Sequence, residues 1–190
     1  YNNLINGLLN LGKYDDALVY ISNAIEIAPE NYELYHKRGN IFLKKNLIEK
    51  ALKAFDEALK IKSDFVPSLR NKVIIFKKTQ RFIEALKVLD ELLLHDKDNF
   101  KAYLQKATIY ISLRNPLEAM RNLKQAKEIK PNSPFLYGDI IHEKTKMCDW
   151  SGLDNELMDI KNKINNDEKV LAPFISTTLF DSPELQLKIS

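Results

Sequence analysis

The chain has 190 residues, of which 45% are hydrophobic and 29% are charged, so it is long and apolar enough to bury a sizeable core and is not a disordered chain. Its net charge of +3 is too small to indicate a nucleic-acid partner without a localised basic face. The single Cys excludes an internal disulfide framework, and no apolar run approaches the roughly 20 residues of a membrane span, so we expect a cytoplasmic protein without a membrane contact.

Matching residue types recur every 34 residues along most of the chain. Small residues dominate two columns, which consist of Ala17, Ala51, Ala85 and Ala119, and of Ala24, Ala58, Leu92 and Ala126. Large residues form three more, which consist of Tyr1, Tyr35, Leu69, Tyr103 and Tyr137, of Leu8, Phe42, Phe76 and Tyr110, and of Tyr14, Ile48, Phe82, Pro116 and Trp150. Small side chains let two helices approach closely, and large ones fill the space that remains.

Each period is expected to contain two amphipathic helices, because its apolar residues are three to four positions apart, as between Ala51 and Ala58. Residues that tolerate a turn mark the break inside each unit, at Gly12, Asn46, Gln80 and Arg114. Pro29 and Pro131 mark the break between units. Since one helix pair cannot bury its apolar face, the pairs should stack into a solenoid.

The period and its columns resemble the tetratricopeptide repeat from about Tyr1 to Met158. The resemblance implies an all-α solenoid, a right-handed superhelix of antiparallel helix pairs. We expect repeats over 1–133, the first one truncated, a modified helix pair over 134–165, and a linker with a short terminal helix over 166–190. One departure is that Arg38, Lys72 and Lys106 occupy a column that is usually apolar; their stems should pack while their charged heads reach water.

The regular pattern stops near Cys148-Asp149-Trp150-Ser151, which follows a predicted helix from Tyr137 to Met147 and leads into one carrying Leu153, Leu157, Ile160 and Ile164. Together with the segments LAPF at 171–174 and LFDSPELQL at 179–187, it resembles the junction after the repeats in O-linked N-acetylglucosamine transferases and their SPINDLY-type bacterial relatives. In that family the junction leads into a sugar-nucleotide-dependent glycosyltransferase domain, which is absent from this chain.

We interpret the residues of this segment as structural. Cys148 has no His close in sequence to activate it, and Trp150 should pack, since its column is apolar. Asp149 or Ser151 is expected to cap the following helix. Asp181, with Pro183 in the first turn and Glu184 after it, should start the last helix.

No reaction chemistry is predicted. His36, His95 and His142 are far apart and lack a second Cys or a paired-His spacing, so we expect neither a metal nor a catalytic site. The five Gly form no phosphate-binding loop, and we expect no cofactor. His95 shares a column with Ile27, Ile61 and Ile129, which predicts a partly buried imidazole.

Binding is what remains. In tetratricopeptide proteins the first helix of each unit lines a concave groove, and here the first helices of units two to four carry ten basic residues against Glu33. The basic residues are Lys37, Arg38, Lys44, Lys45, Arg70, Lys72, Lys77, Lys78, Lys101 and Lys106. The second helices carry most of the acids, including Asp15, Asp56 and Glu57, so we expect the inner face to be positive. Such a groove favours an extended, acidic protein or peptide partner.

The transferase resemblance implies an asparagine ladder that binds a peptide backbone: Asn3 and Asn71 match its main column, and Asn6 and Asn40 stand three positions further on in their units. Lys37, Gln105 and Asp139 occupy the same main column. A rival pattern is the carboxylate clamp of chaperone-binding repeats, matched by Asn40, Asn71 and Lys101 but not by His36 and Gln105. The candidate groove therefore comprises Asn3, Asn6, His36, Lys37, Asn40, Lys44, Arg70, Asn71, Lys78, Lys101 and Gln105.

Three functional hypotheses follow for a chain that is not itself an enzyme. The first is the substrate-recognition arm of an O-GlcNAc-transferase-like glycosyltransferase. The second is a free-standing adaptor that binds acidic or C-terminal carboxylate peptides. The third is an assembly scaffold that forms homo-oligomers.

Overall fold

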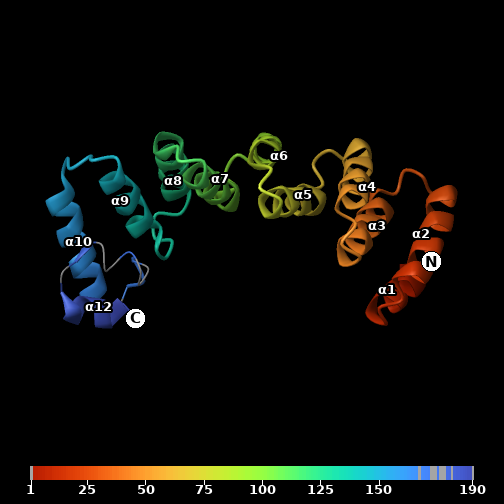
Figure 1. Cartoon of the computed structure of the whole chain (residues 1–190), viewed down its shortest axis with the longest axis horizontal. Helices are drawn as coiled ribbons and strands as arrows, with labels where there is room; N and C mark the ends of the chain where they lie inside the picture. Colours follow the sequence, from red (N-terminus) through yellow and green to blue (C-terminus); the bar gives the residue numbers. More distant parts are fainter. Residues whose placement is uncertain (1, 167, 172–174, 176–178, 181, 190) are drawn as a thin grey trace. The chain divides into compact units, whose positions relative to one another are not determined.

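The computed structural model describes residues 2–166, 168–171, 175, 179, 180 and 182–189 (Figure 1). The chain divides into an N-terminal unit, Tyr1–His95, and a C-terminal unit, Asp96–Ser190. Every regular element within the described residues is an α-helix, which confirms the predicted all-α class. Some expectations rest on residues outside the described ones, namely Tyr1, Ala172, Pro173, Phe174 and Asp181.

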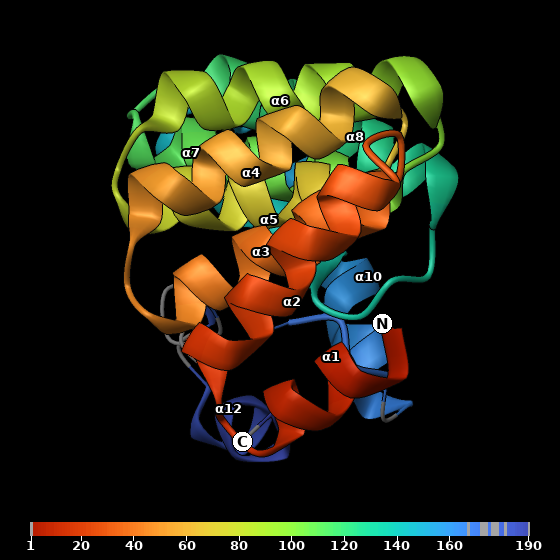
Figure 2. The same cartoon turned by 90° about the vertical axis from the view of Figure 1, so that its right-hand side faces the viewer.

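The N-terminal unit consists of α1 (Asn2–Asn10), α2 (Tyr14–Ile27), α3 (Tyr32–Lys44), α4 (Ile48–Ile61), α5 (Val66–Lys78) and α6 (Phe82–His95). Each helix packs against the next one in the chain. Figures 1 and 2 show this for α1 and α2, which lie side by side. The odd-numbered helices α1, α3 and α5 are the first helices of their repeats, and they carry most of the candidate groove.

The described part of the C-terminal unit consists of α7 (Phe100–Ser112), α8 (Pro116–Ile129), α9 (Leu136–Lys146), α10 (Leu153–Asn165) and α12 (Pro183–Ile189). Neighbours along the chain again pack on one another. Pro183 is the first residue of α12, as expected. None of the helices in the described ranges is long and apolar enough to cross a membrane.

The helix boundaries repeat with the period of the sequence. The first helices α3, α5 and α7 begin at residues 32, 66 and 100, and the second helices α2, α4, α6 and α8 begin at 14, 48, 82 and 116. Both series advance by 34 residues, so the helix pair is the repeating unit. Three helix starts also have side-chain caps: the amide oxygens of Asn31, Asn99 and Asn115 accept bonds from the backbone N–H groups of Glu33, Ala102 and Glu118.

The turn inside each repeat has one fixed form. The predicted turn residues all have positive φ: Gly12 (70°), Asn46 (58°), Gln80 (58°) and Arg114 (54°). The backbone N–H after each of them bonds to the carbonyl five residues earlier, as in Arg81 to Phe76 at 2.8 Å. This bond closes the end of the first helix, and it requires the left-handed residue that precedes it. The column that the sequence marked as turns is therefore confirmed.

The small-residue column lies at the centre of each repeat. Ala17, Ala51, Ala85 and Ala119 are all fully buried. In the second repeat Gly39 adds a closer approach, because a Cβ on it would stand 2.5 Å from the ring of the fully buried Phe55. Close helix contact in these repeats therefore depends on small side chains facing large ones.

The fifth helix pair departs from the pattern at its turn. The period places the start of its second helix at Trp150, but α10 begins at Leu153 after Gly152, which has a φ of 67°. Trp150 is 62% exposed, so the prediction that it packs is wrong. The reason is that it lies in the lengthened turn rather than on the helix that buries its column.

The predicted cap of α10 is also wrong. Gly152 occupies the N-cap position, and no side chain bonds to the free N–H groups there. The Asp149 carboxylate instead accepts the backbone N–H and the hydroxyl of Ser151 at 3.1 and 2.6 Å. Asp149 and Ser151 thus stabilise the turn and not the helix, and these bonds hold the pKa of Asp149 below its usual value.

The chain after α10 returns to α9. The backbone N–H groups of Phe135 and Gly138 donate to the carbonyls of Lys169 and Val170 at 2.8 and 3.0 Å. These carbonyls satisfy N–H groups at the start of α9 that have no partner within the helix. Leu171, Ile175 and Phe180 are buried in one cluster with Ile141, Ile160 and Ile164. The described residues 168–171, 175, 179 and 180, which we call the returning segment, therefore close the core of the last helix pair.

Candidate functional site

The predicted groove residues of the N-terminal unit lie on its three first helices. Within the described residues, Asn3, Asn6, Lys44, Arg70 and Lys78 are exposed, whereas His36, Lys37, Asn40 and Asn71 are half-buried. Lys101, exposed, and Gln105, half-buried, lie on α7 of the C-terminal unit. Among the half-buried residues, His36, Asn40 and Asn71 are joined by hydrogen bonds, whereas Lys37 bonds to the exposed Asn6.

The two asparagine columns meet in pairs. The Lys37 ammonium donates to Asn6 Oδ1 at 3.2 Å, and Asn71 Nδ2 donates to Asn40 Oδ1 at 2.7 Å. Both bonds join residues 31 apart, from the main column of one repeat to the second column of the repeat before it. The structure therefore brings together residues that the sequence placed in separate columns. The next residue of the second column is Ile74, which has no acceptor to continue the series.

Asn40 is also bonded to His36. Asn40 Nδ2 lies 3.1 Å from His36 Nε2, and His36 Nδ1 lies 2.9 Å from Ser68 Oγ. The imidazole packs against the rings of Phe55 and Phe65, with centroids 5.4 and 5.2 Å away. Burial lowers the pKa of His36 below its usual value, against a smaller opposing effect from Glu33. The four residues Ser68, His36, Asn40 and Asn71 thus form a hydrogen-bonded row, which we call the amide row.

The amide row can still bind a peptide backbone. A side-chain amide has two N–H donors and two acceptor lone pairs on oxygen. Asn71 uses one of its donors on Asn40, so its second N–H remains to donate to a peptide C=O and its carbonyl oxygen remains to accept from a peptide N–H. Chemically, this arrangement suits recognition of the backbone and not of any particular side chain.

The basic face is weaker than the sequence predicted. Arg38 pairs with Glu57, Lys45 pairs with Asp15, and the Lys72 ammonium lies 2.6 Å from Asp56. Each of these acids belongs to a second helix, α2 or α4, so acids that were counted on the other face reach the first helices. The charged heads of Arg38 and Lys72 thus end on acids of α4 in partly exposed ion pairs and do not extend alone into water. Lys44, Arg70 and Lys78 remain exposed on α3 and α5.

The other residues singled out in the sequence show no reactive arrangement. Cys148 is exposed and has a φ of 54°, in the turn column, and His95 is exposed because it ends α6, which corrects the predicted partial burial. Nδ1 of His142 is buried without a partner, and burial, followed by Lys146, lowers the pKa of this His. Within the described residues, no three His, Cys, Asp or Glu side chains gather as a metal site would require.

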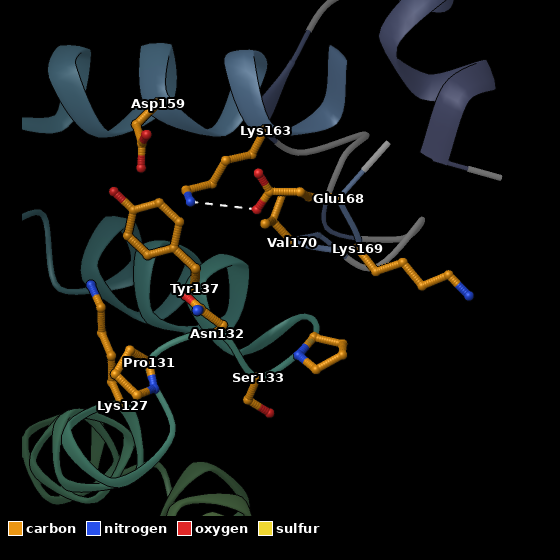
Figure 3. Close-up of a pocket in the computed structure, with 11 residues that line it drawn as sticks. Lys127, Pro131, Asn132, Ser133, Tyr137, Asp159, Lys163, Glu168, Lys169 and Val170 are labelled. Atoms are coloured by element: carbon orange, nitrogen blue, oxygen red, sulfur yellow. Dashed lines mark hydrogen bonds and ion pairs between the residues drawn. The ribbon is translucent and has the colours of Figure 1, made fainter. Parts of the chain in front are cut away.

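A pocket of about 380 Å³ lies in the C-terminal unit, between α8, α9, α10 and residues 168–170. Figure 3 shows the Tyr137 hydroxyl pointing toward Asp159 and the 3.5 Å ion pair of Lys163 with Glu168. Lys127 lies 4.4 Å from the centroid of the Tyr137 ring. Burial, followed by the nearby Asp159 and Glu156, raises the pKa of Tyr137 to about 12. Of the charged residues that line this pocket, Lys163 and Glu168 thus pair with each other, and Lys127 and Asp159 lie against Tyr137.

Ser68 is the member of the amide row that the residue columns did not identify. It is fully buried and occupies a column whose other members, Leu34, Ala102 and Leu136, are buried and apolar. A hydroxyl in an otherwise apolar column needs a partner inside the fold, because an unpaired buried polar group is costly. That substitution in the column was the signal that a partner is needed, and the structure shows that the partner is His36.

Family models of the tetratricopeptide repeat match residues 2–64 and 100–133. These stretches are therefore tetratricopeptide repeats, and the predicted tetratricopeptide solenoid class is confirmed; its superhelical sense stays a prediction. No curated protein matches the chain by sequence.

Several solved structures share this fold. MamA of Desulfovibrio magneticus RS-1, from residue 41 to its end, has a TM-score of 0.65 and 16% identity, with 85% of this chain and 92% of that chain covered. YrrB, described as a TPR protein with an unusual peptide-binding site, has a TM-score of 0.63 and 15% identity, covering 97% and 87%. PilF of Pseudomonas aeruginosa has a TM-score of 0.66 and 15% identity, covering 98% and 86%. At these identities the likeness shows the fold alone.

Proposed function

The chain carries tetratricopeptide repeats, and on that basis we propose that it is a protein-binding module whose N-terminal unit holds an extended peptide along α1, α3 and α5. The observation that carries the proposal is the pair of equivalent bonds, Lys37 to Asn6 and Asn71 to Asn40, which fix polar side chains at a regular interval on these helices. Regularly spaced amides suit a peptide, whose own donors and acceptors are regularly spaced. A fold neighbour, YrrB, is described as having a peptide-binding site, which supports the same class of function.

The peptide is proposed to be acidic. Lys44, Arg70 and Lys78 are the exposed basic residues of the candidate site on α3 and α5, and opposite charge across an interface speeds association and selects partners. Salt should weaken this contribution more than the backbone contacts, because exposed charges are screened.

A carboxylate clamp is a less suitable alternative. That pattern needs a cation where His36 stands, but both ring nitrogens of His36 are engaged with Ser68 and Asn40, and burial lowers its pKa. At neutral pH the residue is an uncharged imidazole, which does not bind a carboxylate strongly.

The proposal extends to the substrate-recognition arm of an O-GlcNAc-transferase-like glycosyltransferase. This extension rests on the sequence resemblance of the segments at 148–151, 171–174 and 179–187 alone. Its test is the coding sequence downstream of Ser190, where a sugar-nucleotide-binding α/β domain is expected; a different domain there would contradict it.

The test of peptide binding uses fluorescein-labelled octapeptides of alternating Glu and Ala, acetylated and amidated at their ends, in anisotropy titrations. Asn71→Ala should weaken binding about tenfold, the effect of losing one or two hydrogen bonds. The matched control is Asn155→Ala, an exposed asparagine on α10, which should bind as the unmodified chain does. A peptide with Gln in place of Glu should lose its dependence on Lys44 and Arg70.

Three results would overturn the proposal. Unchanged affinity for Asn71→Ala would remove the backbone contact. Strong binding only to peptides with a free C-terminal carboxylate would favour the clamp. Light scattering that gives a mass of two or more chains, with no peptide binding, would favour the assembly scaffold.

A further inference from the structure

His36 lies between Ser68 and Asn40 in the amide row, with both ring nitrogens engaged. Nδ1 faces Ser68 Oγ at 2.9 Å, and Nε2 faces Asn40 Nδ2 at 3.1 Å. Phe55, on α4, and Phe65, just before α5, cover the ring. The imidazole therefore has no room to turn without losing contacts on both sides.

The chemistry of these contacts sets their direction. An amide nitrogen only donates, so Nε2 must accept and carries no proton. The proton of the neutral imidazole is then on Nδ1, which donates to Ser68 Oγ. Because Asn40 points its nitrogen at His36, its oxygen is the atom that accepts from Asn71 Nδ2 at 2.7 Å. One tautomer of one His thus determines which way two asparagine side chains face.

We infer that His36 is a positioning residue: it sets the orientation of the Asn40 and Asn71 amides, and its protonation reverses both and weakens peptide binding. The binding part of this inference rests on the proposed function. His36 itself need not touch the peptide, since it acts through Asn40 and Asn71.

Protonation of His36 changes which atoms of the amide row donate and which accept. An imidazolium carries a proton on both nitrogens, so Nε2 becomes a donor that faces the donor Asn40 Nδ2. Asn40 must turn its oxygen toward His36, which directs its nitrogen at Asn71. Asn71 must then turn its oxygen toward Asn40. The peptide meets an amide nitrogen where it previously met a carbonyl oxygen, so the donor and acceptor order of the site is inverted.

The surroundings favour the neutral form at ordinary pH. From α4 and the start of α5 the ring is faced by Phe55, Phe65 and Ser68, none of which is charged, and on α3 the acting charge is Glu33. Burial lowers the pKa of His36 more than Glu33 raises it. Because the folded-state pKa lies below the usual value of 6.5, the neutral row is complete above that pH and is lost as the pH falls through the lowered pKa.

The experiment follows the side-chain amide resonances of Asn40 and Asn71 by nitrogen-15 NMR on the full chain without peptide, from about pH 8 to about pH 5. Both should shift with the midpoint of the His36 ring resonances. In His36→Gln, whose amide can still accept from Asn40 and donate to Ser68 but does not titrate, they should stay constant. His95→Gln, which changes an exposed His of the same unit, should titrate like the unmodified chain.

The same samples are then titrated with the Glu-Ala octapeptide. Affinity should fall about tenfold across the His36 midpoint in the unmodified chain and in His95→Gln, an estimate for one inverted hydrogen-bond pair, whereas His36→Gln should show no such fall. Amide resonances that stay constant while the His36 ring titrates would overturn the positioning role, even if the peptide binds. Resonances that move, with no peptide binding at any pH, would overturn the proposed function and the binding part, and support the positioning part. The unmodified chain decides this even if a variant fails to fold.

Discussion

The regular repeats and the fifth helix pair share the turn that ends the first helix. They differ in the number of residues between the first helix and the second. In the second repeat three residues separate the end of α3 at Lys44 from the start of α4 at Ile48. In the fifth pair six residues separate Lys146 from Leu153. Both turns contain a left-handed residue, Asn46 in one and Cys148 in the other. The difference shows that the turn stops the first helix, whereas the number of residues after it decides which side chains the second helix buries.

The two regions also differ in what a buried glycine on the first helix makes room for. Gly39 makes room for Phe55 of the helix that follows in the same repeat, whereas Gly138 makes room for Leu171, and a Cβ on it would stand 2.4 Å from Leu171 Cδ1 and 2.8 Å from the Val170 carbonyl. In the regular repeat the close contact is between helices. In the last pair it is between a helix and the returning segment, which replaces the next repeat as the cover of the core.

Truncating one large aromatic residue in each region should give the largest difference. Phe55→Ala removes a fully buried ring, and we expect the free energy of unfolding to fall by about 3–5 kcal/mol. Trp150→Ala, the matched change in the fifth pair, removes a ring that is 62% exposed, and we expect a change within about 0.5 kcal/mol. The measurement is urea denaturation followed by circular dichroism. Equal losses for both variants would mean that Trp150 is buried after all.

Adding a methyl group at Gly138 should have the second-largest effect. The Cβ meets the backbone of the returning segment as well as Leu171, so Gly138→Ala should lower the free energy of unfolding by about 1–3 kcal/mol, as overpacking does. Hydrogen exchange should be faster at Phe135 and in α9 of this variant, because the added methyl group would push Val170 away and weaken the backbone bonds to Lys169 and Val170. Gly7→Ala is the control: nothing lies within 4 Å of its Cβ, so it should be neutral or stabilising, because Ala favours a helix more than Gly does. Unchanged exchange in α9 would show that the returning segment does not cover it.

The sequence predicted the repeats well because their signals are local and occur several times. Ala17, Ala51, Ala85 and Ala119 repeat one packing requirement, and Gly12, Asn46, Gln80 and Arg114 repeat one backbone requirement. The fifth pair could not be placed by the same pattern. Trp150 has the residue type of its column, but the turn extends to Leu153 and leaves Trp150 outside the helix. Periodicity could not predict this longer turn, because the residue at the expected helix start still fits the pattern.

The candidate site could be predicted only in part. Residue columns identified Asn6, Asn40 and Asn71 as polar positions on first helices, but their pairing depends on the offset between adjacent repeats, which one column does not contain. The charge count failed for a related reason. It assigned Asp15, Asp56 and Glu57 to the other face, whereas long side chains of Lys45, Lys72 and Arg38 reach them across the helix boundary.

The smallest expected effect tests whether the two turns are in fact equivalent. Cys148 and Gln80 occupy the same column, and both have the positive φ that L side chains adopt at a cost, 54° and 58°. After each, a backbone N–H reaches the carbonyl five residues earlier, from Asp149 to Lys144 at 3.2 Å and from Arg81 to Phe76 at 2.8 Å. Glycine removes the steric cost but loses more entropy on folding, so Cys148→Gly and Gln80→Gly should each stabilise the chain by about 0.5–1 kcal/mol in urea denaturation. A gain at Gln80 without one at Cys148 would show that the longer turn holds its left-handed residue less firmly, and that the fifth pair departs from the repeats already at Cys148 and not first at Trp150.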